Sequence, residues 1–158
     1  MTASSILALA FLIGVLAGLR SLTAPAVVAF AARQGWMNLH NTALSFMGST
    51  AAFAIFALLA LGELVADKLP ATPSRTAPLG LGTRIATGGL CGACVALAGS
   101  QSPVLGAALG IVGGLAGTYG GYRARTGLVK ALQVPDFVIA VIEDATAIGG
   151  SLLIVSRF

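Results

Sequence analysis

The sequence predicts an all-α protein, a polytopic bundle of transmembrane helices. Three observations predict it: 57% of the 158 residues are hydrophobic and only 9% are charged, the mean hydropathy is +0.96, and the apolar residues form long runs. A water-soluble domain carries roughly a quarter of its residues as charged side chains, so we expect lipid to cover this surface. None of the runs alternates as a barrel strand does, and open strands cannot satisfy their backbone in lipid.

Five apolar segments follow one another in a single transmembrane domain over residues 1–158, which allows about five spans of roughly 20 residues. We expect them at residues 4–32, 43–66, 79–98, 104–122 and 137–156. The first is longer than a bilayer core of roughly 30 Å requires. It contains Pro25, which removes a backbone donor and disfavours helix at the residue before it. We therefore expect a break near residues 20–25, followed either by an interfacial helix or by the second half of a discontinuous one.

The placement of lysine and arginine predicts the orientation, because cytoplasmic loops carry an excess of both. With five crossings, a cytoplasmic N-terminus places six basic residues in the cytoplasmic segments 68–84 and 123–136, and leaves two, Arg33 and Arg157, outside. The sequence therefore predicts a cytoplasmic N-terminus and an external C-terminus.

Two stretches of the chain resemble each other. Residues 14–18 (GVLAG) and 113–117 (GGLAG) are each followed by an arginine and then by a span that carries acidic residues. One span separates the two pairs, so the copies enter the membrane in opposite directions. This predicts an inverted repeat of spans 1–2 and 4–5, an arrangement that places transporter sites near the midplane.

Acidic residues inside apolar segments are the leading candidates for function. Glu143 and Asp144 lie well inside the segment 137–156, where a charge costs roughly 2.5–3.5 kcal/mol on insertion scales and normally faces a partner or a water-filled cavity. Adjacent residues point about 100° apart on a helix, so we expect the two acids to have different partners. Glu63 and Asp67 are four residues apart and share one helix face.

Two arginines flank these acids and are suited to partly buried pairing. We consider Arg20 paired with Glu63 or Glu143, and Arg123 paired with Asp144 or Glu63. The alternative is a set of buried ion pairs that only fixes helix packing. The predicted polar centre consists of Arg20, Glu63, Asp67, Arg123, Glu143 and Asp144.

Glycines recur every four residues along the fourth segment, at 106, 110 and 114 and again at 113, 117 and 121. Small residues at this spacing let helices approach closely, so we expect this helix to be central. Cys91 and Cys94 form a CxxC pair, but zinc needs four ligands and only His40 could assist. We therefore expect two small apolar side chains and neither metal nor cofactor.

Three runs, GLRSLTAP at 18–25, GELVADKLP at 62–70 with TPSRT at 72–76, and GGYR at 120–123, resemble a bacterial membrane family catalogued as domain of unknown function 4126. The resemblance covers nearly the whole chain. It implies a protein of the bacterial inner membrane and supplies neither an activity nor site residues.

These observations favour a small transporter or channel for a cation or a proton-coupled solute, in the bilayer as a homo-oligomer, most simply a dimer. A second hypothesis is a lipid-handling protein, and a third is a non-catalytic membrane scaffold. We expect no enzyme, because no histidine lies in a predicted span, and no nucleic-acid partner, because the basic residues form no stripe. Anionic headgroups in the second hypothesis would meet Lys68, Ser74, Arg75, Thr76, Arg84, Arg125 and Lys130.

Overall fold

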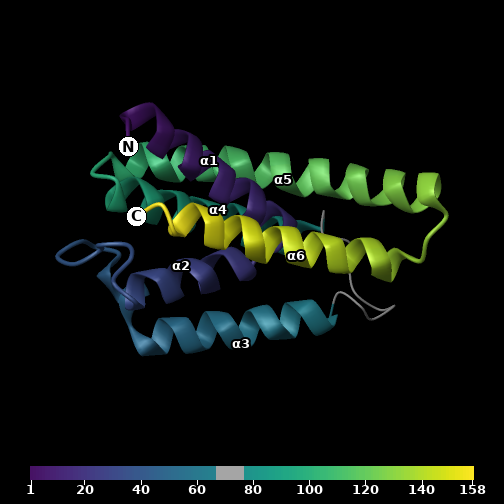
Figure 1. Ribbon diagram of the computed structural model, residues 1–158, viewed down its shortest axis with the longest axis horizontal. Helices are drawn as coiled ribbons and strands as arrows, with labels where there is room; N and C mark the ends of the chain where they lie inside the picture. The colour runs from purple at the N-terminus through teal and green to yellow at the C-terminus, as the bar shows by residue number, and fades with distance from the viewer. Residues whose placement is uncertain (67–76) are drawn as a thin grey trace.

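The computed structural model describes residues 1–66 and 77–158, and within them it contains six α-helices, one short 3-10 helix and no strand. The predicted all-α class is confirmed. The helices α4, α5 and α6 are long and apolar enough to cross a membrane, and the other three are shorter apolar helices. These features indicate a multi-pass membrane protein. The elements in Figure 1 are α1 (Ala3–Leu19), α2 (Thr23–Arg33), η1 (Ser45–Gly48), α3 (Thr50–Ala66), α4 (Pro78–Ala98), α5 (Pro103–Leu132) and α6 (Asp136–Val155).

Two predicted boundaries are corrected. The second segment becomes helical at Thr50 and not at residue 43, because the Ser49 hydroxyl accepts from the backbone N–H of Ala52 at 3.0 Å and begins the helix there. The fourth segment does not end at residue 122. It continues as helix to Leu132 through a stretch in which good helix formers (arginine, alanine, leucine and lysine) outnumber Thr126, Gly127 and Val129. It stops where Gln133 adopts a left-handed conformation with φ 52°, shortly before Pro135.

The first apolar segment forms a helical hairpin. The break lies at residues 20–22, within the expected region, and Pro25 sits in the first turn of α2, where its missing N–H costs little. α1 runs parallel to α5, since Gly14 lies against Gly110 and Gly18 against Gly114. α2 then returns to the end of the bundle from which α1 started (Figure 1). The remaining helices run from end to end in alternating directions.

Two sequence predictions fail because of this hairpin. The first segment turns back and does not cross the bundle, so the N- and C-termini lie at the same end (Figure 1) and not on opposite sides. The glycine-rich stretches 14–18 and 113–117 run parallel, as the contacts of Gly14 and Gly18 show. An inverted repeat would require them to run in opposite directions.

The glycines of α5 make the predicted close helix contacts, but the helix is not central: it lies along one edge of the bundle (Figure 1), and its buried residues are mainly these glycines. A methyl group on Gly110 would collide with the backbone of Gly88 in α4, and one on Gly117 would collide with the backbone of Val15 in α1. The two glycine faces of α5 therefore hold α4 and α1 at backbone contact, which is how membrane helices gain packing energy without a hydrophobic driving force.

Candidate functional site

The turn of the hairpin lies among buried charges. Arg20, at the end of α1, is completely buried. Its Nη2 atom lies 2.6 Å from Oδ1 of Asp144 on α6, whose side chain is 12% exposed. A buried charge of this kind is tolerated only with a close partner, so this ion pair joins the hairpin tip to α6.

Glu63 on α3 binds the start of α2. Its Oε1 accepts from the backbone N–H of Ser21 at 2.9 Å and from the Ser21 hydroxyl at 2.6 Å, and its Oε2 accepts from the N–H of Leu22 at 2.8 Å. The unpaired N–H groups and the dipole of a helix N-terminus favour an anion at this position. The carboxylate therefore satisfies donors that the break leaves without helical partners.

Arg84 on α4 binds the end of α1 in the complementary way. Its Nε donates to the carbonyl of Gly18 at 3.1 Å, and the hydroxyl of Thr118 donates to the same oxygen at 3.4 Å. A guanidinium favours the negative end of a helix. Arg84 also lies 3.7 Å from Oε1 of Glu63, so the charges at the two broken helix ends are themselves in contact.

A second group of charges leads from the surface toward these residues. We use the term charge cluster for Arg20, Glu63, Arg84 and Asp144, together with Arg125 and Glu143 of this second group. Arg125 on α5 donates to Oδ1 of Asp136 at 2.8 Å through Nε and to Oε2 of Glu143 at 3.3 Å through Nη1. The side chains of Asp136, Arg125 and Glu143 are 61%, 14% and 8% exposed. Glu143 is adjacent to Asp144 in the sequence. The charged side chains therefore become progressively more buried from the exposed start of α6 toward the Arg20–Asp144 pair.

The structure brings together four of the six residues predicted for the polar centre: Arg20, Glu63, Glu143 and Asp144. Within the described residues Arg20 pairs with Asp144, and not with Glu63 or Glu143 as predicted. Asp144 was one of the two acids predicted for Arg123. Arg123 itself is exposed and forms no ion pair with the described part of the chain. The predicted site residues Asp67, Lys68, Ser74, Arg75 and Thr76 lie outside the residues that the structure describes.

Two cluster residues were assigned another role by the sequence analysis. Arg84 and Arg125 were predicted as headgroup contacts, whereas the structure buries Arg84 and pairs both with acids. Arg84 was recognisable, because it lies inside the apolar segment 79–98. Arg125 was not, because its position depends on the extension of α5 beyond residue 122. Lys130, the remaining described basic residue of that group, is exposed.

The described residues contain no group of three or more histidine, cysteine or acidic side chains placed to hold a metal ion. Cys91 and Cys94 are buried and free in α4, among the side chains of the hydrophobic core.

The fold and the cluster define a class of protein: a helical membrane protein with a hairpin whose turn is enclosed by charged side chains. Over residues 7–156 the chain matches the family described as "Domain of unknown function (DUF4126)", and it belongs to that family. The resemblance noted in the sequence is thereby confirmed. No curated protein and no solved structure matches the chain.

Proposed function

We propose that the protein is a small transporter or channel of the bacterial inner membrane, in which a cation or a proton-coupled solute passes the buried charge cluster. The observation that carries this proposal is the hairpin turn held by Glu63 and Arg84. Non-helical backbone at membrane depth is tolerated where it is buried in protein or lines a water-filled cavity. Helix ends of this kind serve transporters as ion-binding elements.

In the proposed arrangement, α3 is a fourth crossing beside α4, α5 and α6, and the α1–α2 hairpin enters and leaves on one side. The stretch from Thr23 to Arg33 rises about 15 Å at 1.5 Å per residue. The turn then lies about halfway through a hydrocarbon core of roughly 30 Å. This depth is suitable for a site reached from both sides of the bilayer.

Proton coupling follows from the pairing of the charges. Protonation of Asp144 removes its anionic contact with Arg20. Protonation of Glu143 removes one acid that contacts Arg125, which also contacts Asp136. Either event leaves a guanidinium with one anionic contact fewer in a low-dielectric region, where such contacts are strong. A solute or a second ion that restores the lost contact is thereby coupled to the proton. The series Asp136, Arg125, Glu143 supplies an entry route from the exposed end of α6.

The chain is small, and we propose that a homodimer encloses the pathway. A lipid-handling role receives less support, because the described basic residues Arg84 and Arg125 are engaged with acids and not presented on a surface. A scaffold without transport is the remaining alternative, and the flux experiment separates it from the proposal.

The test is proton and cation flux in proteoliposomes. Wild-type protein is expected to conduct, and Glu143→Gln with Asp144→Asn is expected to reduce flux to the level of empty vesicles. Because the double variant also loses stability, its flux is measured on the fraction that size-exclusion chromatography shows to be folded. Arg123→Gln is the matched control, since this arginine is exposed and outside the cluster, and it should conduct as wild type does. A wild-type protein that passes nothing, with acid variants that only lose stability, would show that the cluster is structural.

A further inference from the structure

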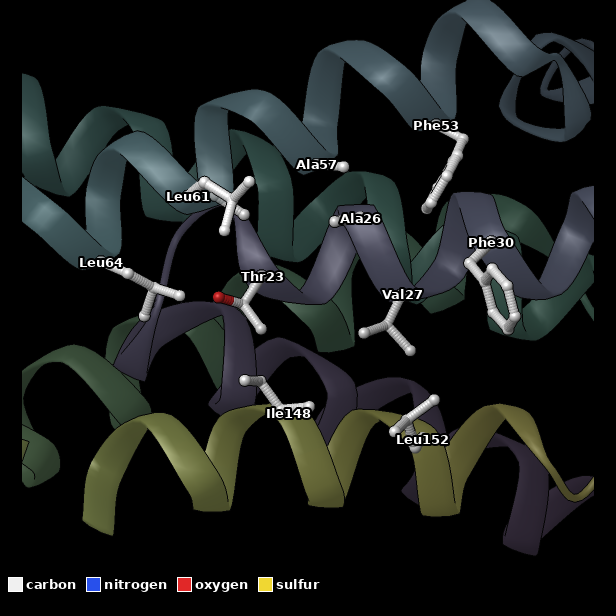
Figure 2. A pocket seen from close by; sticks show the side chains of 11 residues that line it. Thr23, Ala26, Val27, Phe30, Phe53, Ala57, Leu61, Leu64, Ile148 and Leu152 are labelled. Carbon is white, nitrogen blue, oxygen red and sulfur yellow. The ribbon is translucent and has the colours of Figure 1, made fainter. Parts of the chain in front are cut away.

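A groove of about 320 Å³ lies beside the hairpin, bounded by α2, α3 and α6 (Figure 2). Ten of the eleven residues that line it are apolar, with Phe30 and Phe53 toward one end and Leu64 and Ile148 toward the other. The exception is Thr23. The volume lies within the range of about 300–1,000 Å³ that small-molecule sites occupy.

The hydroxyl of Thr23 is the unusual feature of this groove. Thr23 is only 4% exposed, and its Oγ1 makes no hydrogen bond to any residue that the structure describes. In Figure 2 the oxygen points along the groove toward the side of Leu64. A threonine within a helix commonly donates to the carbonyl four residues earlier, but Thr23 is the first residue of α2 and has no such carbonyl in its own helix.

An orphaned buried hydroxyl is costly unless a partner supplies the missing hydrogen bond. The groove thus offers one donor in an otherwise apolar site. That composition suits a largely apolar ligand that presents an acceptor oxygen to this hydroxyl.

The depth of the hydroxyl restricts the ligand further. Arg33 and Trp36 stand at the far end of α2, and tryptophan is typical of the membrane interface. Thr23 lies about 15 Å from that end by helix rise. A charged headgroup is expensive at such a depth, and none of the groove's described lining residues carries a charge that would compensate it. The ligand is therefore uncharged.

We propose that the groove binds an uncharged, lipid-soluble carbonyl compound, of which a quinone with an apolar side chain is the simplest example. A carbonyl oxygen accepts from the Thr23 hydroxyl on the Leu64 side of the groove. The apolar side chain of the ligand extends along the groove toward Phe30 and Phe53. The groove adjoins the charge cluster, since Thr23 directly follows the backbone N–H groups that Glu63 binds, but none of its described lining residues carries a charge, and the proposal does not depend on transport.

The protein contains its own reporter for this site. Trp36 is its single tryptophan, and its ring centroid lies 5.7 Å from that of Phe30, which lines the groove. Titrating the full chain in nanodiscs with a decyl-substituted benzoquinone should quench the Trp36 fluorescence saturably. Thr23→Val removes one hydrogen bond and should weaken binding about five- to tenfold, whereas Thr23→Ser keeps the donor and should bind nearly as wild type.

A pair of variants on α3 tests the location. Ala57→Phe fills the groove and should abolish saturable quenching. Ala54→Phe, one helical turn earlier, exposed and outside the lining, should leave it unchanged. Decylbenzene, which lacks an acceptor, should compete poorly. Quenching that does not saturate, or that Thr23→Val and Ala57→Phe leave unaltered, or equal competition by decylbenzene, would each overturn the proposal.

Discussion

At the scale of single residues, the energetics centre on the Arg20–Asp144 pair. Arg20 is fully buried and its contact with Asp144 is 2.6 Å long. Burying two charges costs several kcal/mol per ion, and their attraction offsets this only while both are present. The net contribution of the ion pair to the free energy of unfolding is therefore smaller than the destabilisation that replacing either residue alone would cause.

Asp144→Asn should lower the free energy of unfolding by about 3–5 kcal/mol, because it leaves Arg20 with one buried anionic contact fewer. Arg20→Gln should cost a similar amount. The double variant should recover part of the loss, since both charges are then absent. Thermal or denaturant unfolding followed by Trp36 fluorescence provides the measurement. Strictly additive losses would show that the two side chains are not energetically coupled.

At the scale of the helices, α1, α4 and α5 pack with their backbones in direct contact at glycines. The stability of the bundle therefore depends on individual glycines. Gly110→Ala should destabilise the bundle by more than about 2 kcal/mol or prevent its assembly, because the added methyl meets the backbone of Gly88 in α4. Gly120 lies on the same helix with nothing within 4 Å of an added methyl. Gly120→Ala should therefore gain about 0.5–1 kcal/mol from helix propensity. Detergent-resistant folding and thermal midpoints compare the two, and equal effects would contradict the packing described.

The α1–α2 hairpin is stabilised by the hydrogen bonds that Glu63 and Arg84 make at its turn. Glu63→Gln keeps one acceptor oxygen but places an amide N–H₂ against a backbone N–H donor, either of Ser21 or of Leu22. Such a mismatch costs about 1–3 kcal/mol. We expect faster hydrogen exchange across the first turns of α2, with little change in α4 and α5. Uniform acceleration in every helix would indicate global destabilisation and not a local opening of the hairpin.

At the scale of the whole molecule, the sequence predicts where most helices lie along the chain, but it does not predict the direction in which the chain runs after the first helix. Apolar runs predicted α4 and α6, and four-residue glycine spacing predicted the close contacts of α5, because both patterns act locally. The residues at 20–22 permit either a kink or a reversal, and the choice depends on Glu63 and Arg84, which arrive from helices distant in sequence. The sequence did not predict Arg125 as a partner of Glu143, because the mean hydropathy falls after Tyr122. The helix nevertheless continues to Leu132, since most of the residues that follow are good helix formers.

The hairpin also changes the expected topology of the protein. Since the first segment turns back, the N-terminus lies at the same end as the C-terminus (Figure 1), and the proposed arrangement keeps the opposite end on the cytoplasmic side. The excess of basic residues remains at the opposite end. Of the residues that the structure describes, Arg123, Arg125 and Lys130 lie at that end by sequence, against Arg33 and Arg157 at the end with the termini.

Reporter fusions test this topology directly. Alkaline phosphatase fused to either terminus should be active, because it folds only outside the cytoplasm, and green fluorescent protein at either terminus should be dark. The same reporters inserted in the turn between α5 and α6 should give the reverse pattern. Termini on opposite sides would require an odd number of crossings, and the α1–α2 segment would then have to span the bilayer. In that case the turn would no longer place Arg20 beside Asp144, and the charge cluster on which the proposed function depends would not exist in the membrane.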